Sequence, residues 1–382
     1  MLILFGAGHV AEREILSGET PAFVADNNPD LQNSRILGVE ILSPERLTAL
    51  NGILQVIICT SSILDVQEQL HSLGISSAQI SVSTYLGSAA QVYRLEQFCF
   101  RGFVSCGLPS SRKSLHGGGV YQVEENSSEL KITKIFEGNC RNIELHGTRL
   151  DVACQGRGIV QICTKTLEVN NEIPIPKPAS IHGIRRFGDH YYATDPESDS
   201  VLVLEQSGKV VNRYSISDKF ATTGSPQHHV NDLYILNNSI YVSMFSLSGN
   251  WKNGIFDGGV VEVDMSTGNI RAVVDSLKMP HNVMFREDGE FYILDSLRGK
   301  ILGYDRSDIG TLPGFTRGLA FSDNFIIVGE SKNRNISKLE RGEMLSSIDT
   351  RVTIVDPAIK ASRSIPMPQG ISEIHAIAPL SN

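Results

Sequence analysis

A repeat of short strands runs through the chain from about residue 100 to residue 382. Residues 103–124 (FVSCGLPSSRKSLHGGGVYQVE) and 241–264 (YVSMFSLSGNWKNGIFDGGVVEVD) share a strand, a polar loop, a Gly-Gly pair and an alternating strand. Residues 181–196 and 280–296 form a second matching pair. Periods of about 40–50 residues built from short strands are typical of a β-propeller, in which one position of every blade faces a central channel.

Aligning the repeats on that axial position predicts six inner strands. Their first residues are spaced 41, 49, 50, 36 and 58 residues apart. They are Arg141, His182, Asn231, His281, Arg317 and His375. We therefore expect a six-bladed propeller over residues 100–382. The last inner strand lacks a following partner, so we expect residues 103–106 to complete its blade and close the ring, which removes open sheet edges.

The six axial residues predict a chemical site. His182, His281 and His375 fall on alternate blades, and three converging imidazoles suit Zn²⁺ or a similar divalent metal with open positions for water or substrate. Arg141 and Arg317 are candidates to bind a carboxylate or phosphate, and Asn231 to ligate or orient. The alternative is that these histidines are hydrogen-bonded residues lining a water-filled channel. The charged segment 332–351 is interpreted as a solvated loop, with a lid over the channel as the alternative.

The first 95 residues follow a different pattern, in which strands alternate with helices. Strands are expected at residues 2–5, 22–25, 39–42, 54–60 and 80–83, and helices after the first, third and fourth. This alternation predicts an α/β domain with a Rossmann-like parallel sheet.

A glycine-rich turn follows the first expected strand. Gly6-Ala-Gly8-His9-Val-Ala11 fits G-x-G-x-x-[GA], so the backbone can approach a phosphate at the start of a helix. Asp26 ends the second strand, where an acidic residue can bind a ribose hydroxyl. The alternative is that these glycines only make a tight turn.

Composition limits the partners and the compartment. The net charge of −8 disfavours a nucleic-acid partner, because both molecules would be negatively charged. No run approaches the ~20 apolar residues that span a bilayer, and no signal peptide is recognised. The six cysteines show no CxxC spacing and suit buried free thiols in a reducing compartment. We therefore expect a cytoplasmic protein with a small-molecule substrate, and the sequence leaves its oligomeric state open.

The first domain resembles the small Rossmann-like domain of bacterial sugar acyltransferases. The segments that carry the likeness are FGAG, FVADNNP, GVEILSPERL and VIICT. The resemblance implies that a nucleotide-sugar binds at Gly6, Gly8, His9, Asp26 and Asn27. No hexapeptide-repeat acyltransferase domain follows it here.

The repeats resemble the NHL and gluconolactonase-like propellers. Within that group the axial pattern is similar to the peptidyl-hydroxyglycine amidating lyase, which implies His182, His281 and His375 as zinc ligands and Arg141 as a flanking arginine. That lyase's second arginine and its tyrosine correspond to Ser296 and Phe245, so the same reaction is not implied. His281 takes the place of one member of the acidic-Asn-Asp set of gluconolactonases. The segments HHVNDL and MPHNV also resemble bacterial two-domain proteins of unassigned function.

Three hypotheses follow. The first is a metal-dependent hydrolase or lyase that acts in the propeller channel on a small anionic or sugar-derived substrate, with a nucleotide or nucleotide-sugar in the first domain. The second is a ligand-binding protein of a polysaccharide or secondary-metabolite pathway, without chemistry of its own. The third is an NAD-linked oxidoreductase with a propeller scaffold, although the first domain lacks a second α/β half to carry a substrate.

Overall fold

The chain consists of two compact units, Met1–Phe98 and Cys99–Asn382. The computed structural model describes residues 1–382 with the exception of 109–116, 127–128, 178, 340–345 and 381–382. Each unit has hydrophobic clusters of its own.

The first unit is an α/β fold around one sheet of order β3-β4-β2-β1-β5-β6. Its strands are β1 (Leu2–Phe5), β2 (Phe23–Ala25), β3 (Arg35–Ile36), β4 (Val39–Leu42), β5 (Gln55–Ile58) and β6 (Ile80–Val82). Its helices are α1 (His9–Leu16), η1 (Pro44–Ala49), α2 (Ile63–Ser72), η2 (Ser77–Gln79), η3 (Thr84–Leu86) and α3 (Ser88–Gln97). Alternate residues of β1 enter different cores, because Leu4 packs with Val10 of α1 whereas Ile3 and Phe5 pack with Val66 of α2.

The sheet of this unit is mixed and small, which corrects the expected parallel sheet. The pairs β4–β2, β2–β1, β1–β5 and β5–β6 are all parallel. The edge strand β3 instead pairs antiparallel with β4 in a hairpin. The short strand β3 has two residues, too few to produce a clear alternation in the sequence. The likeness to a Rossmann-like domain is therefore only weak.

The second unit is a β-propeller of six four-stranded sheets, which confirms the predicted blade number. The first three blades are β10 (Cys140–His146), β11 (Arg149–Cys154), β12 (Gly158–Cys163) and β13 (Val169–Ile173); β14 (Ile184–Phe187), β15 (His190–Asp195), β16 (Ser200–Leu204) and β17 (Val210–Ser215); and β18 (Val230–Leu236), β19 (Ser239–Met244), β20 (Gly258–Asp264) and β21 (Ile270–Leu277).

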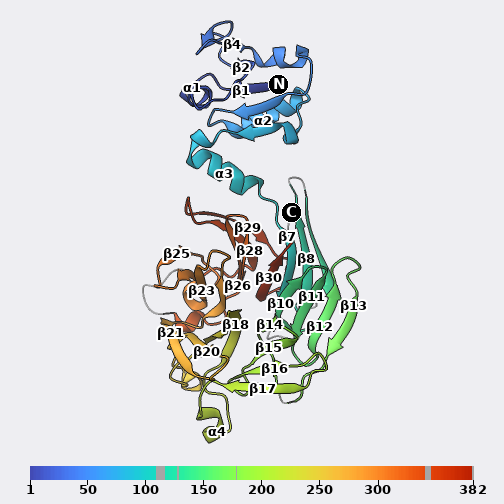
Figure 1. Cartoon of the computed structure of the whole chain (residues 1–382), viewed down its shortest axis with the longest axis vertical. Helices are drawn as coiled ribbons and strands as arrows, with labels where there is room; N and C mark the ends of the chain where they lie inside the picture. The colour runs from blue at the N-terminus through green and yellow to red at the C-terminus, as the bar shows by residue number, and fades with distance from the viewer. Residues whose placement is uncertain (109–116, 127–128, 178, 340–345, 381–382) are drawn as a thin grey trace. The chain divides into compact units, whose positions relative to one another are not determined.

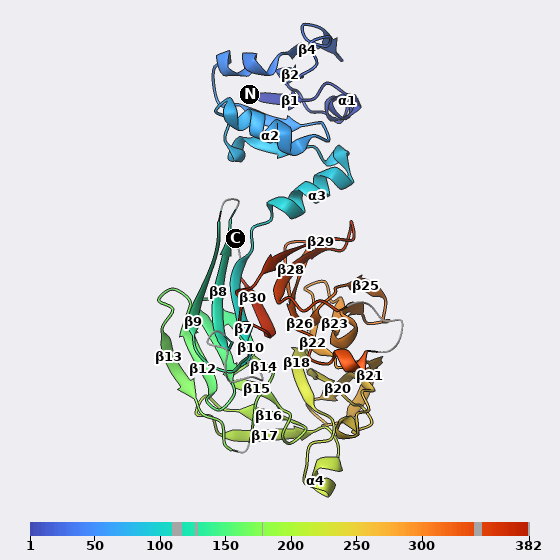
Figure 2. The same cartoon turned by 180° about the vertical axis from the view of Figure 1, so that it is seen from behind.

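The remaining three blades complete the ring (Figures 1 and 2). They are β22 (His281–Phe285), β23 (Phe291–Asp295), β24 (Lys300–Gly303) and β25 (Asp308–Thr311); β26 (Phe315–Ser322), β27 (Phe325–Ser331), β28 (Arg351–Asp356) and β29 (Ala361–Pro366); and β30 (Ile374–Pro379), β7 (Arg101–Cys106), β8 (Gly119–Glu125) and β9 (Leu130–Phe136). The last sheet joins the two ends of the propeller sequence, because β30 pairs antiparallel with β7. Short helices α4 (Lys219–Thr223), η4 (Trp251–Asn253), η5 (Ser296–Arg298) and η6 (Ile336–Lys338) lie in the connections.

Most inner strands are irregular where they begin. The pairing register shifts near the start of β10, β18, β22, β26 and β30, the pattern of a β-bulge. A bulge re-aims neighbouring side chains, so consecutive residues such as His281 and Asn282 reach different cavities of the channel. The channel therefore has two chemically distinct ends.

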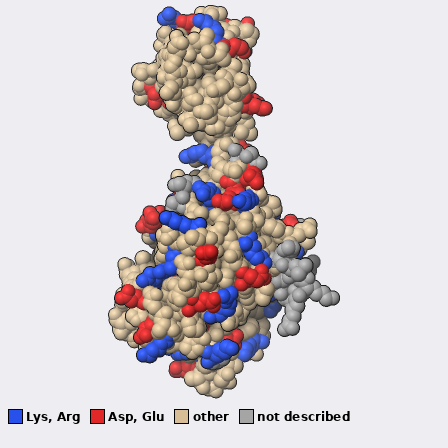
Figure 3. Space-filling view, turned by 90° about the vertical axis from the view of Figure 1, so that its right-hand side faces the viewer, with Lys and Arg blue, Asp and Glu red and all other residues tan. Residues whose placement is uncertain are grey.

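The surface of the protein carries both signs of charge. On the face shown in Figure 3, lysine and arginine side chains are interspersed with aspartate and glutamate. Among the described helices, none is long and apolar enough to cross a membrane.

The backbone of β18 packs so closely against Gly183 that a larger residue there is expected to destabilise the propeller. A Cβ at Gly183 would lie 2.9 Å from Asp232 Cα and 3.1 Å from Asn231 O, closer than side-chain atoms approach backbone. We expect Gly183→Ala to destabilise the propeller by about 1–3 kcal/mol, because the backbone of β18 must move. Thermal unfolding measures this loss as a lower midpoint.

The matched control is Gly310→Ala in β25, where the nearest atom would lie 3.9 Å away in ordinary contact and φ is not positive. The control should unfold at or slightly above the wild-type midpoint, because alanine restricts the unfolded chain. Equal midpoints for the two variants would contradict the close-packing argument.

Candidate functional site

One cavity collects residues at or next to the beginnings of all six inner strands. It has a volume of ≈ 590 Å³ and lies where these strands begin. Its lining includes each axial residue expected from the repeats, namely Arg141, His182, Asn231, His281, Arg317 and His375. We call this space the histidine–arginine cavity.

A buried carboxylate that the sequence analysis did not find organises the arginines. Glu373 is 1 % exposed, and its Oε2 lies 3.5 Å from Arg317 Nη1 and 3.8 Å from Arg141 Nη1. Arg334 Nη1 lies 2.7 Å from the other oxygen, Oε1. Burial works to raise the pKa of Glu373, but His375 and the arginines outweigh it and hold this pKa below its usual range. Three guanidinium groups therefore surround one ionised carboxylate.

The guanidinium groups retain unused hydrogen-bonding capacity. The Nε atoms of Arg141 and Arg317 are buried and have no hydrogen-bond partner among the described residues. Burial lowers the pKa of Arg317 to about 10, which still leaves this side chain charged at neutral pH. Buried polar groups are normally paired, so these N–H groups favour an acceptor from a ligand.

His375 joins the arginine cluster at its edge. Its Nε2 lies 3.0 Å from Arg141 Nη1 and 3.1 Å from Glu373 Oε2. This ring nitrogen is therefore already engaged by two charged neighbours.

His281 presents a different face to the cavity. Its Nδ1 lies 3.0 Å from the Met279 carbonyl oxygen and 2.9 Å from Ser296 Oγ. A carbonyl oxygen can only accept, so Nδ1 carries the proton and Nε2 is the basic nitrogen. Asn231 donates from Nδ2 to the Pro280 carbonyl at 3.2 Å, and this contact positions the segment that leads into His281.

A fourth histidine, His229, lies in the same cavity and was not among the predicted axial residues. Its ring lies 5.7 Å from that of His182 and 4.6 Å from that of Trp251, measured between centroids. Asp199 accepts hydrogen bonds from the backbone N–H groups of His228 and His229, both at 2.9 Å, and so fixes this loop. The motif HHVND contained this signal, but nothing in its spacing distinguishes His229 from His228, which is hydrogen-bonded to Ser217 and Ser246 instead.

All four cavity histidines are neutral at physiological pH. Burial, with the positive charge of nearby arginines, lowers the pKa of His229 and of His375 to about 3. The same causes hold the pKa of His182 and of His281 well below the usual value. A neutral imidazole has a free lone pair that can accept a proton, and an anion bound beside the arginines would offset the positive charge that lowers its basicity.

The zinc centre expected on His182, His281 and His375 stays a prediction, and the placement of these side chains bears on how they could hold a metal. Across the described ranges, no three His, Cys, Asp or Glu side chains are grouped closely enough to hold a metal ion. His182, His281 and His375 share the cavity, but His375 Nε2 contacts Arg141 and Glu373 rather than the other two imidazoles. The residues as placed fit an anion site better than a tetrahedral metal site.

The loop 332–351 contributes to the cavity. Arg334, Asn335 and Lys338 from this segment line it, while residues 340–345 lie outside the described part of the chain. Because these residues belong to an irregular connection rather than to a repeat, aligning the repeats could not identify them.

The nucleotide-site residues predicted in the first unit surround a separate cavity of ≈ 570 Å³. Gly6, Gly8, His9, Asp26 and Asn27 all line it. Asp26 Oδ2 accepts the Ala7 N–H at 2.6 Å, and Oδ1 accepts the Asn28 N–H at 2.7 Å. Asn27 exchanges two hydrogen bonds of 2.9 Å with Gln69 of α2. Asp26 therefore holds the glycine-rich turn, a role distinct from the expected contact with a ribose.

The neutral histidines predict how stability depends on pH. Between about pH 6.5 and about pH 3 the unfolded chain binds protons that the folded cavity does not, so the free energy of unfolding falls on acidification. Each such histidine contributes a slope of up to about 1.4 kcal/mol per pH unit. We expect His229→Gln to weaken the fall of the thermal midpoint between about pH 6.5 and 5.

His190→Gln is the matched control, because His190 begins β15 outside the cavity lining and is partly exposed. It should keep the wild-type profile. An identical pH profile for His229→Gln and wild type would show that the His229 imidazole is not held neutral.

Comparisons with known proteins support the propeller fold and leave its function open. The profile of a domain of unknown function (DUF4915) matches residues 215–382. No curated protein matches the sequence significantly. A chain of a nidogen/laminin complex is 13% identical with a TM-score of 0.51, covering 73% of this chain and 97% of that one.

Two further solved structures are similar. A protein of unknown function from Bacteroides caccae is 13% identical with a TM-score of 0.50, covering 74% of this chain and 100% of that one. Regucalcin, a calcium-binding protein from Agrobacterium tumefaciens, is 8% identical with a TM-score of 0.43, covering 58% and 72%, a likeness too low to carry an argument. At these identities the likeness shows the fold alone: the second unit is a six-bladed β-propeller similar in its C-terminal part to a domain family of unknown function.

Proposed function

We propose that the propeller binds a small anionic molecule in the histidine–arginine cavity and transforms it by acid–base chemistry. The observation that carries the proposal is the surplus of guanidinium charge around Glu373, with buried Nε groups that lack partners. The charged residues that line the cavity or contact its arginines are Arg141, Lys252, Arg317, Arg334 and Lys338 against Glu197, Asp232 and Glu373. A carboxylate or phosphate would satisfy this surplus by charge-assisted hydrogen bonds.

The apolar part of the cavity favours a ligand with a ring or carbon skeleton. Phe245, Trp251 and Phe256 line the cavity beside the histidines. His281 packs edge-on against Phe245 with centroids 5.4 Å apart. Sites of this kind use an apolar wall for affinity and a few polar groups for orientation.

His281 is the residue we assign as general base. Its Nδ1–H is held by Met279 O, so Nε2 can accept a proton from water or from a carbon atom beside the anionic group. Arg317 and Arg141 would stabilise the negative charge that develops as that proton leaves. Both steps suit hydrolysis or elimination, so a hydrolase or lyase is the reaction class proposed.

A metal-dependent version of this proposal places Zn²⁺ on His182, His281 and His375. His375 would have to exchange its contacts with Arg141 and Glu373 for the metal. Metal analysis of protein purified without a histidine tag tests this version, and stoichiometric zinc that is lost in His281→Ala would support it.

The anion site is tested with inorganic phosphate as the probe. We expect phosphate to bind and raise the thermal midpoint, Arg317→Gln to weaken its affinity about tenfold or more, and Glu373→Gln to tighten it. Glu373→Gln should also lower the midpoint in the absence of phosphate, because the buried Arg317 and the partly buried Arg141 lose their counter-ion. Titration calorimetry measures the affinities.

Glu330→Gln is the matched control. Glu330 is buried and paired with Arg351 at 2.8 Å, but it does not line the cavity. This variant should lose stability without any change in phosphate affinity. Phosphate binding that survives Arg317→Gln unchanged would overturn the proposed anion site.

The same cavity also suits a ligand-binding protein without chemistry. In that case His281→Gln would leave both ligand affinity and the fate of the bound molecule unchanged. Loss of turnover with retained affinity in His281→Gln would favour the enzyme.

A nucleotide or nucleotide-sugar site in the first unit is a second proposal, supported by the cavity around the glycine-rich turn. Gly8 has ordinary backbone angles, and a Cβ there would meet nothing within 4 Å. We expect Gly8→Ala to keep the stability of the unit but abolish nucleotide binding, because the new methyl group would fill the space of a phosphate.

Thermal-shift titration with a UDP-sugar and with NAD measures this effect. A response to the UDP-sugar alone favours the sugar-nucleotide site, whereas a response to NAD alone favours an oxidoreductase. If neither ligand shifts wild-type protein, or if Gly8→Ala responds like wild type, the turn is structural only.

A further inference from the structure

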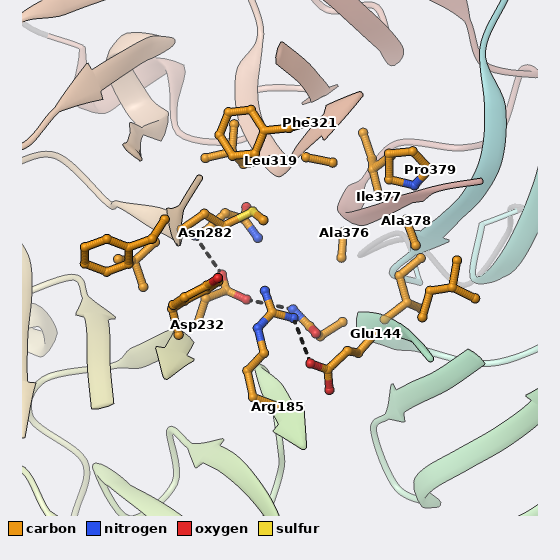
Figure 4. Close-up of a pocket in the computed structure, with 18 of the residues that line it drawn as sticks. Glu144, Arg185, Asp232, Asn282, Leu319, Phe321, Ala376, Ile377, Ala378 and Pro379 are labelled. Atoms are coloured by element: carbon orange, nitrogen blue, oxygen red, sulfur yellow. Dashed lines mark hydrogen bonds and ion pairs between the residues drawn. The ribbon is translucent and has the colours of Figure 1, made fainter. Parts of the chain in front are cut away.

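The propeller has a second cavity at the opposite ends of its inner strands. This cavity has a volume of ≈ 700 Å³, and residues at the ends of these strands, such as Leu145, Phe285 and Pro379, line it. The histidine–arginine cavity lies instead where the strands begin. Figure 4 shows this second space, which we call the lower cavity.

Three buried polar side chains form the floor of the lower cavity. Asn142, Asp232 and Asn282 are 5 %, 7 % and 6 % exposed. Asp232 accepts hydrogen bonds from Asn142 Nδ2 at 3.0 Å and from the Asn282 backbone N–H at 3.1 Å. A dashed line in Figure 4 marks the bond between Asn282 and Asp232. Asn282 Oδ1 in turn accepts the Gly318 N–H at 2.6 Å.

The floor offers acceptors that the chain leaves unused. Because Asn142 Nδ2 donates to the carboxylate, its Oδ1 is the atom that remains, and Oδ1 is buried without a partner among the described residues. Burial raises the pKa of Asp232, which reflects the cost of a carboxylate in a dry site, although its two N–H donors and Arg185 favour the charged form. A ligand that donates several hydrogen bonds and carries positive charge would relieve both groups.

The walls of the lower cavity differ on its two sides. Leu319, Phe321, Ile377 and Pro379 form an apolar side, as Figure 4 shows. On the other side Arg185 Nη1 lies 3.8 Å from Glu144 Oε1, and the guanidinium lies 5.5 Å from the ring centre of Tyr234. The Arg185 guanidinium thus pairs with Glu144, and its charge also favours the ionised form of Asp232.

The charge of the lower cavity is opposite in sign to that of the histidine–arginine cavity. Four carboxylates line it against three guanidinium groups. These are Glu144, Asp232, Glu287 and Asp323 against Arg185, Arg186 and Arg286. One positive charge on a ligand would therefore balance the site.

We propose that the lower cavity is a second binding site, for a small primary amine with an apolar body. The ammonium group donates to Asp232 and to Asn142 Oδ1, since its three N–H groups match these acceptors where a single hydroxyl would not. The carbon skeleton packs against Leu319, Phe321 and Ile377, and the volume suits a ligand of this size. This site is independent of the proposed anion site, although the side chain of Asp232 lies between the two cavities and lines both.

The experiment titrates the full chain with 2-phenylethylamine by calorimetry at neutral pH. Two probes of similar shape, neutral 2-phenylethanol and anionic 3-phenylpropanoate, serve as comparisons. We expect the amine to bind at least about tenfold more tightly than the alcohol, and the acid not to bind. Asp232→Asn should reduce the affinity for the amine about tenfold or more while nearly preserving side-chain shape.

Asp232→Asn changes a buried residue and could impair folding, so a second variant tests the same site at a less buried position. Glu144→Lys places a positive charge on the half-buried wall and should also abolish amine binding. Glu287→Lys makes the same change at an exposed lining position and should leave most of the affinity, as should Arg317→Gln in the other cavity. The proposal is overturned if the alcohol binds as tightly as the amine or if no amine binding is detected. It is also overturned if folded Asp232→Asn or folded Glu144→Lys binds the amine as tightly as wild type.

Discussion

The chemistry of the propeller depends on how its inner strands begin. A register shift at that point lets two consecutive residues of one strand serve different ends of the channel, as with Arg141 and Asn142 or His281 and Asn282. Asp232 ties three blades together there, because it accepts from Asn142 of one blade and from the backbone of Asn282 in another. A buried carboxylate satisfied in this way fixes the blades relative to one another and divides the channel into two cavities.

The two cavities owe their opposite character to the distribution of buried charge. In the histidine–arginine cavity, Glu373 holds Arg141, Arg317 and Arg334 close together. Burial, with the positive charge of Arg317 and Arg141, keeps the four imidazoles there neutral. In the lower cavity, carboxylates outnumber guanidinium groups, and the buried amide oxygen of Asn142 has no partner among the described residues. Within a low-dielectric channel such differences are felt strongly, so neighbouring cavities can select ligands of opposite charge.

Much of the fold could be predicted, because each blade repeats one pattern of alternating residues and tight turns. The six blades follow from that repeat, whereas the mixed sheet of the first unit does not, since β3 is only two residues long. The six axial residues line one cavity, whereas the roles predicted for them stay predictions. Glu373 is absent from that axial list because it lies two positions before His375, ahead of the aligned position. The list also missed His229 and Arg334, which reach the cavity from irregular segments without a period.

The sequence by itself determined the succession of blades and the polar residue at the start of each inner strand, because both repeat along the chain. Only the tertiary structure decided what those residues contact. Which partners the three histidines have depends on distances across the channel, and in the structure His375 contacts both Arg141 and Glu373. The contacts of Asp26 were also decided by the tertiary structure. The sequence pattern predicts this residue at the end of a strand, and in the fold its carboxylate accepts a hydrogen bond from the Ala7 N–H. Contacts between residues far apart in the sequence do not follow the period of the repeat. They can therefore be identified only from the folded ring.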